Sequence, residues 1–198
     1  NELVVGGNFM QDQGYKLGAN DARYRINAGL KHISKKYKGL TYGLNVNNNY
    51  NKGTLFFIWQ NADSVLFPQA DDTSTTLSDY LSSRIMIDPY ISYLDENGNT
   101  HNFKTRFFRT NNTNSTNQAS ASNFYYGEYQ FHRRWTDIGL AMTTGAMMSY
   151  TDVISELYGP HTSNNIAAFI QGDQKWEKVT LSAGMRLEYF RIDTTFTQ

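Results

Sequence analysis

Residues 165–190 read NIAAFIQGDQKWEKVTLSAGMRLEYF, and this stretch decides the fold of the chain. From Val179 to Tyr189 every second residue is apolar, while the residues between them include Arg186 and Glu188. Because successive side chains of a strand point to opposite faces, the stretch predicts a strand with one apolar face and one polar, partly charged face. The class of protein then depends on what covers the apolar face, a protein core or lipid.

The composition predicts a mostly β protein. Of the 198 residues 15% are aromatic, fourteen are Tyr and none is Cys. Tyr favours strands and the abundant Asn favours turns. A net charge of zero gives no reason to expect a nucleic acid as partner. No run of apolar residues is long enough for a transmembrane helix.

Nine segments are strand-like, and helical periodicity is poor except for a short turn around Leu77–Leu81. Pro89 falls inside the fourth segment and cannot donate a ladder hydrogen bond, so we expect either that this strand begins near Tyr90 or that a bulge lies there. The predicted strands are Glu2–Met10, Ala22–Ser34, Leu40–Tyr50, Arg84–Leu94, His101–Arg109, Asn123–Arg133, Ile138–Tyr150, Asn165–Trp176 and Val179–Arg191.

The connections between these strands alternate between long and short. Asn97-Gly98 predicts a two-residue hairpin turn, because both residues tolerate a positive φ. In an up-and-down sheet every short turn lies at one edge and every long loop at the other, which is typical of outer-membrane barrels. The short connections are Lys35–Gly39, Asp95–Thr100, Arg134–Asp137 and Glu177–Lys178; the long ones are Gln11–Asp21, Asn51–Ser83, Thr110–Ser122 and Thr151–Asn164.

Aromatic residues lie near both ends of the predicted strands. Tyr37, Trp135 and Trp176 each stand beside a short turn with basic neighbours, and Tyr50 and Tyr150 stand at the opposite strand ends. These positions fit the two interfacial girdles of a barrel, although rings that cap hairpins of a soluble sheet would occupy them equally. Strands of about ten residues, rising ~3.3 Å each and tilted by ~45°, span roughly 23 Å, close to the height of a barrel's apolar band.

Together these patterns predict an all-β, antiparallel up-and-down transmembrane β-barrel in the bacterial outer membrane. Bacterial single-chain barrels have an even number of strands, and lipid does not tolerate an open sheet edge. We therefore expect residues 1–198 to form a partial barrel domain, in contact with outer-membrane lipid and with the remainder of its own barrel.

Two hairpins resemble those of TonB-dependent outer-membrane receptors. Residues 168–176 (AFIQGDQKW) and 179–189 (VTLSAGMRLEY) are similar to a late barrel hairpin of that family, in which an aromatic strand turns directly into a strand with a Gly-x-Arg-hydrophobic-Glu pattern. Residues 22–50 (ARYRINAGLKHISKKYKGLTYGLNVNNNY) resemble an earlier hairpin with a basic turn. Residues 87–108 resemble receptors from the Bacteroidota.

The resemblance implies a receptor that imports a scarce nutrient: an iron chelate, haem, cobalamin, an oligosaccharide or a peptide. It also implies a 22-stranded barrel whose lumen is filled by an N-terminal plug domain. No plug domain is recognisable in residues 1–198. The implied partners are that plug, the TonB complex, contacted through an N-terminal part, and a surface lipoprotein.

Two groups of residues are candidates for contact with a ligand. Alternation places six polar side chains toward the lumen of a barrel, where they either form salt-linked ladders that hold the wall and touch the plug or contact the substrate directly: Lys104, Arg106, Glu128, Gln130, Arg186 and Glu188. Four aromatic residues cluster in the long loop after Tyr50, where they either form part of a ligand mouth or continue the strands above the membrane: Phe56, Phe57, Trp59 and Phe67.

No catalytic or metal site is predicted, and no cofactor. The histidines His32, His101, His132 and His161 have no short metal-ligand spacing, and no nucleophile elbow or phosphate-binding loop occurs. Asp95, Asn97 and Asn99 have calcium-loop spacing without the rest of the loop, which favours a plain turn.

Two other kinds of protein fit the same pattern. A passive porin or adhesin-like barrel would lack the plug and the N-terminal part that contacts the TonB complex. A soluble lipocalin-like or sandwich protein that binds a small apolar ligand would direct Leu140, Met142, Leu181 and Met185 into one closed core.

Overall fold

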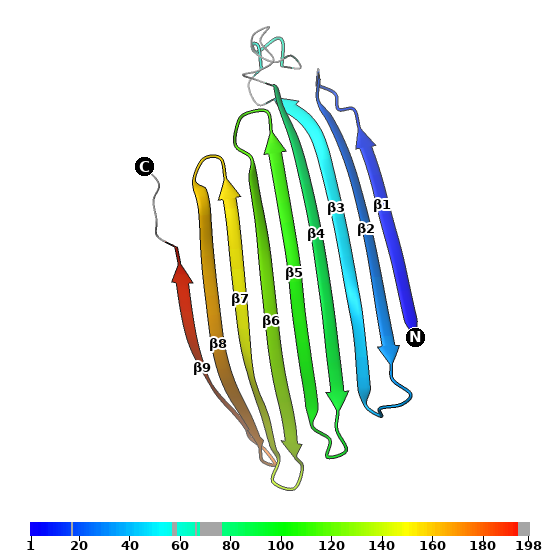
Figure 1. The fold of residues 1–198 in the computed structure, drawn as a ribbon, viewed down its shortest axis with the longest axis vertical. Helices are drawn as coiled ribbons and strands as arrows, with labels where there is room; N and C mark the ends of the chain where they lie inside the picture. The colour runs from blue at the N-terminus through cyan, green and yellow to red at the C-terminus, as the bar shows by residue number, and fades with distance from the viewer. Residues whose placement is uncertain (17, 57–58, 66, 68–76, 194–198) are drawn as a thin grey trace.

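The computed structural model describes residues 1–16, 18–56, 59–65, 67 and 77–193, and they form nine β-strands (Figure 1). All nine predicted strands are confirmed, and most extend beyond their predicted bounds. The strands are β1 (Glu2–Asp12), β2 (Asn20–Ile33), β3 (Leu40–Phe56), β4 (Leu77–Leu94), β5 (Thr100–Asn114), β6 (Ser120–Trp135), β7 (Leu140–Ser155), β8 (Gly159–Lys175) and β9 (Thr180–Ile192). None of the described residues forms a helix that is long and apolar enough to cross a membrane.

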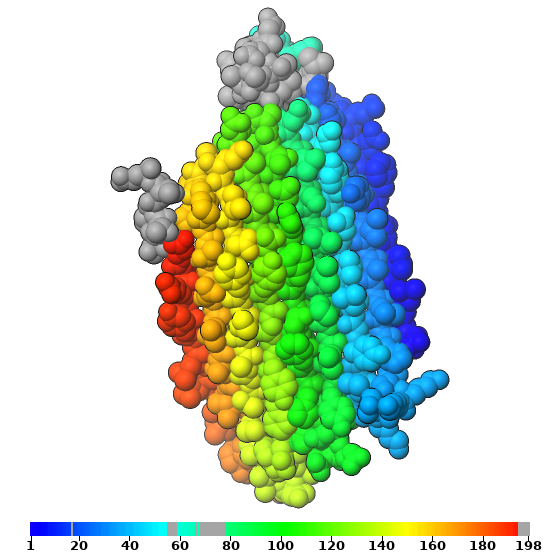
Figure 2. Space-filling view, viewed as in Figure 1, coloured from blue at the N-terminus to red at the C-terminus, as the bar shows by residue number. Residues whose placement is uncertain are grey.

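The strands make one antiparallel up-and-down sheet in the order β1 to β9, each paired with its neighbours in the chain. Figure 2 shows them side by side as one continuous layer. The connections after β2, β4, β6 and β8 lie at one end of the strands, called here the turn end. The connections after the odd-numbered strands lie at the opposite end, called the loop end (Figure 1). The sheet is open, with β1 and β9 as its two edge strands.

The strand register sorts side chains onto two faces. Directly opposed residues of an antiparallel pair share a face, so a row can be followed across the sheet from Val5 through Ala28, Val46, Ile87, Phe107 and Tyr125 to Tyr150. The side that holds this row is called the apolar face, and it also holds Leu3, Leu30, Leu44, Ile91, Phe103, Met148, Ile166, Met185 and Leu187. The opposite side is called the polar face, and it holds Asn8, Arg25, Asn49, Arg84, Lys104, Glu128, Arg186 and Glu188.

The described residues contain almost no hydrophobic core. Ala167, 2% exposed, is their one buried hydrophobic residue. Leu181 is 58% and Met185 61% exposed, and both lie on the apolar face with Leu140 and Met142. These four side chains therefore do not converge inside a closed core, as a lipocalin-like protein would require.

The lengths of the connections differ from the prediction at the loop end. The connection between β7 and β8 comprises only residues 156–158, and that between β5 and β6 only residues 115–119. The expected helical turn at Leu77–Leu81 is the first part of β4. The strict alternation of long and short connections is thus wrong, because the polar segments assigned to loops continue the strands.

The expected interruption at Pro89 takes neither predicted form. β4 runs from Leu77 to Leu94, and Pro89 pairs with Leu44 of β3. On the β5 side the ladder omits Asp88 and Pro89, yet Ile87 opposite Phe107 and Tyr90 opposite Lys104 keep the same register, so no bulge lies between them. The missing N–H of proline thus costs the β4–β5 ladder two pairs without shifting it.

The Asn97-Gly98 turn is longer than predicted. Gly98 has a φ of 78°, whereas Asn97 is not among the described residues with positive φ. Asp95 accepts hydrogen bonds from the backbone N–H groups of Asn97 and Asn99 and from Asn99 Nδ2, each at 2.8 Å. Asp95 N donates to Asn99 O, and Gly98 N to Asp95 O. The hairpin is therefore closed by a three-residue loop with one left-handed glycine, and the calcium-like spacing builds a turn.

Candidate functional site

The polar face carries all six polar residues predicted to face a lumen. Lys104 on β5 lies directly opposite Glu128 on β6, and Phe169 of β8 opposite Arg186 of β9. Arg106 Nε and a terminal guanidinium nitrogen donate to the two carboxylate oxygens of Asp88 at 2.8 and 2.9 Å. This bidentate pair joins β4 to β5 where the backbone ladder between them is interrupted.

Two further groups of polar contacts lie on this face, one along β6 and one joining β8 to β9. Glu128 accepts hydrogen bonds from the Tyr126 hydroxyl and from Gln130 Nε2. Glu188 accepts from Arg186 Nε at 3.0 Å and from Asn165 Nδ2 of β8 at 2.7 Å. Arg106, Glu128, Gln130, Arg186 and Glu188 thus bond to other side chains of the sheet, which favours a role in holding the wall over direct contact with a substrate.

Aromatic residues gather at the turn end. Lys36 Nζ lies 5.2 Å from the ring centroid of Tyr37, and the Arg133 guanidinium 4.7 Å from that of Trp135. Trp176 begins the turn between β8 and β9, where its backbone N–H donates to Val179 O at 2.8 Å. Tyr37 and Trp135 thus each lie beside a cation, and Trp176 is 53% exposed.

The turn end also holds a cluster that the sequence analysis did not find. His101 Nδ1 lies 2.8 Å from the Tyr129 hydroxyl, and the His101 ring lies near the rings of Tyr93 and Phe131. Cross-strand register alone brings these residues from β4, β5 and β6 together. His101 therefore belongs to an aromatic cluster. No group of three or more His, Cys, Asp or Glu side chains in the described ranges is placed to hold a metal ion.

A second set of aromatic rings lies on the apolar face farther toward the loop end. Tyr50 stacks on Tyr24 with centroids 5.0 Å apart, and Tyr150 lies beside Tyr125 at 6.2 Å. Tyr42, on the same face of β3 as Tyr50, lies near the turn end. The eight-residue separation covers ~26 Å along the strand.

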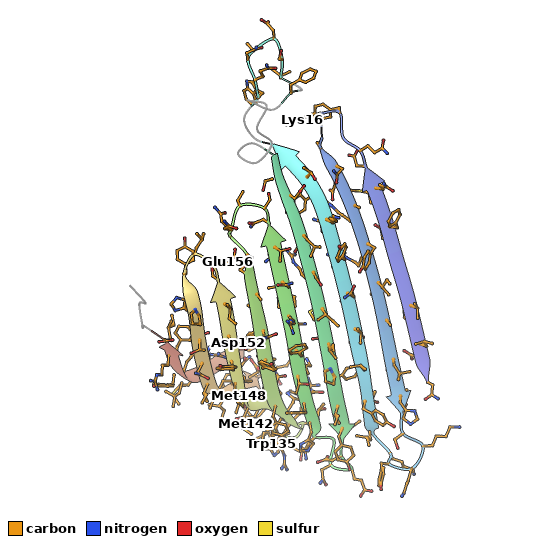
Figure 3. The ribbon with its side chains drawn as sticks, turned by 45° about the horizontal axis from the view of Figure 1, so that its top comes forward. Lys16, Trp135, Met142, Met148, Asp152 and Glu156 are labelled. Carbon is orange, nitrogen blue, oxygen red and sulfur yellow. The ribbon has the colours of Figure 1, made fainter. Side chains whose placement is uncertain are left out.

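Beyond this second set of rings charged and amide side chains enter the side that carries the apolar face, where they lie among isolated apolar residues such as Leu81 and Ile154. On the side of the sheet that continues the apolar face, Arg109 lies opposite Asn123 and Asn123 opposite Asp152. Asn123 Nδ2 donates to Asp152 Oδ2 at 2.8 Å. Figure 3 shows the change along β6 and β7, from Trp135 at the turn end through Met142 and Met148 to Asp152 and Glu156. The apolar face is therefore a band bounded at both ends.

The loop aromatics are only partly placed. Phe57 lies outside the described residues, and the side chain of Phe56, the last residue of β3, does too. Trp59 and Phe67 are 53% and 48% exposed, in a segment where Gln60 N donates to Phe67 O at 3.0 Å. A ligand mouth formed by these four residues stays a prediction.

Comparison of the chain with protein-family models, with curated proteins and with solved structures found no match. The resemblance of the two hairpins to receptor barrels stays a prediction from their residues.

Proposed function

We propose that this chain forms part of the wall of an outer-membrane β-barrel receptor that imports a scarce nutrient, with energy supplied through TonB. The observation that carries the proposal is the apolar band: exposed side chains on one face of a sheet without a core, between two sets of aromatic rings, with polar residues beyond. Lipid is the environment that stabilises such a band, since burying it in hydrocarbon removes apolar surface from water.

The contacts on the polar face support the proposal that this face lines the lumen of a barrel. Its charged groups have partners within the sheet: Arg106 pairs with Asp88 across β5 and β4, Arg186 pairs with Glu188 along β9, and Asn165 of β8 donates to Glu188, as in a wall that borders water or a plug. In the proposed function, loops capture the ligand and a plug gates the lumen. Transport makes and breaks no covalent bond, so we assign no catalytic residue. We propose an energised receptor rather than a passive porin because two hairpins of the chain resemble those of TonB-dependent receptors.

Val46→Arg tests the membrane assignment. Val46 lies midway between Tyr42 and Tyr50 on the apolar face, opposite Ala28 and Ile87, and an arginine at such a position costs about 2–4 kcal/mol of folding free energy in lipid. Leu81→Arg is the matched control, because Leu81 lies on the same face beyond the Tyr50 ring, opposite Lys52, where the cost is about 0–1 kcal/mol. Unfolding in lipid vesicles measures both variants.

Equal effects of the two substitutions, or a protein that fractionates without detergent as a soluble, cooperatively folded species, would contradict the membrane assignment. Nutrient uptake by cells with and without TonB then separates the receptor from a porin. Uptake that persists unchanged without TonB would contradict the energised receptor and favour passive diffusion.

A further inference from the structure

A polar hollow of about 440 Å³ lies on the polar face over β1 to β4. Neither the wall contacts of Arg106, Glu128 and Glu188 nor the loop aromatics belong to it. Its lining includes three arginines from two strands, Arg23 and Arg25 of β2 and Arg84 of β4, together with Asn49 and Asn51 of the intervening β3.

The strand register places Arg25 and Arg84 on either side of β3. Arg25 lies directly opposite Asn49, and Asn49 directly opposite Arg84, so the two arginines flank Asn49 in one row. Neighbouring strands lie ~4.8 Å apart, which separates the two Cα atoms by about 10 Å, within the combined reach of two arginine side chains. Arg23 and Asn51 form the next row toward the loop end, opposite each other.

Two of the three arginines of this hollow have no counter-ion among the described residues. Arg23 forms an ion pair with Asp21. Asp88, the acidic residue on the same face of β4, is bound by Arg106. Arg25 and Arg84 have no ion pair or hydrogen bond among the described residues, although both line the hollow. The N–H donors of these two guanidinium groups therefore have no acceptor bound to them among the described residues.

Asn51 adds an unsatisfied group to the wall of the hollow. Its Oδ1 atom is buried without a hydrogen-bond partner. A buried polar atom of this kind costs free energy unless a ligand or water completes it. A hydroxyl or N–H group on a ligand, beside the anionic group held by the arginines, would satisfy it.

We propose that this hollow is a binding site for an anionic solute, in which Arg25 and Arg84 hold a carboxylate or phosphate group from two sides and Asn51 accepts a hydrogen bond from a neighbouring hydroxyl. Guanidinium groups match both anions through paired N–H donors, and two of them favour a solute with more than one negative charge. The inference rests on the proposed function in one respect, that the polar face is open to solutes. It narrows the imported nutrients to anionic ones.

Titration calorimetry on the full-length, detergent-solubilised protein tests the site. The probes are citrate, which carries three carboxylates and a hydroxyl, tricarballylate, which lacks the hydroxyl, and inorganic phosphate. We expect citrate to bind more tightly than tricarballylate, and the affinity for each probe to fall as salt increases. Arg25→Gln and Arg84→Gln should each weaken citrate binding by about tenfold or more, since each removes hydrogen bonds to a charged group.

Arg109→Gln is the matched control. Arg109 is also an exposed strand arginine but lies on the other face, opposite Ile85, so this substitution should leave citrate affinity unchanged. Absence of binding by the wild-type protein, or an equal loss in Arg109→Gln, would overturn the anion site. If the protein gives either of these two results but still inserts into lipid vesicles, the anion site is wrong and the proposed membrane function stands. A soluble protein that binds citrate through Arg25 and Arg84 would instead contradict the receptor and keep the site.

Discussion

At the scale of single residues, three glycines of the polar face lie beneath aromatic rings. Gly43 is opposite Tyr90, Gly53 opposite Tyr80 and Gly145 opposite Phe169. A Cβ atom on Gly43 would lie 2.4 Å from Leu30 O and 2.6 Å from Tyr90 Cζ, and one on Gly145 2.6 Å from Phe169 Cζ. Each ring thus covers a backbone that has no side chain of its own, an arrangement that stabilises glycine positions in sheets.

Gly43→Ala should destabilise the fold by about 1–3 kcal/mol, because the added methyl group would collide with the backbone oxygen of Leu30 and with the Tyr90 ring. Gly172→Ala is the control, since a Cβ there would meet nothing within 4 Å. Urea unfolding in detergent micelles compares them. A Gly43 variant as stable as the Gly172 variant would show that the Tyr90 ring is not held over the glycine.

Asp95 makes the stability of the β4–β5 turn dependent on pH. Hydrogen bonds from the Asn99 side chain, and then from the Asn99 and Asn97 backbone, favour the charged carboxylate and lower the pKa of Asp95. A group with a lowered folded pKa contributes stability above its ordinary pKa, here 3.8, and loses it as the pH falls through the folded value.

Asp95→Ala should therefore unfold at lower urea than the wild type at pH 6, and the difference should shrink as the pH is lowered below 3.8. Unfolding curves at a series of pH values measure it. A difference that stays constant through this range would show that the charge of Asp95 is not what the turn uses.

At the scale of strands, alternation predicted the existence and order of all nine but not their full length. Alternation of apolar and polar residues occurs within the apolar band, where one face of each strand is apolar and the other is polar. Past the band polar residues occupy both faces of some segments, such as Asn111 to Asn114, so alternation ends there although hydrogen bonding continues. Asn-rich segments also favour turns, which placed loops where the structure has strand.

Arg106→Gln should weaken the β4–β5 contact by about 0.5–1 kcal/mol, the range of a well-aligned but partly exposed ion pair. A double-mutant cycle with Asp88→Asn isolates the coupling. Lys104→Gln is the comparison, because Lys104 lies on the same face of β5 but forms no ion pair in the described part of the chain. A coupling of zero would mean that the pair does not replace the backbone bonds absent at Pro89.

At the scale of the whole molecule, the sequence indicated the class of sheet but not the places where distant strands meet. Arg25 and Arg84 are far apart in the chain, and the register across β3 brings them together. The only local signal was the alternation of Arg23 and Arg25, which also fits a polar wall. The aromatic cluster around His101 was missed for the same reason, since it joins three strands.

Hydrogen exchange of the full-length protein in detergent tests whether its edges are covered. If β1 and β9 pair with further strands, the outward-facing amides of Glu2–Asp12 and Thr180–Ile192 should exchange as slowly as those of the central β5. Exchange that is fast along one whole edge and slow in β5 would show that this edge lacks a strand partner, and would contradict a closed barrel.

The two open edges have a consequence for how any closed wall can form. β1 and β9 run in the same direction, because each of the intervening steps reverses the chain. Joining them directly, or joining the β9 of one copy to the β1 of the next in a ring, would create a parallel seam in an otherwise antiparallel wall. A wall that is antiparallel throughout needs an odd number of strands between these edges, and the first and last of them must run from the loop end to the turn end.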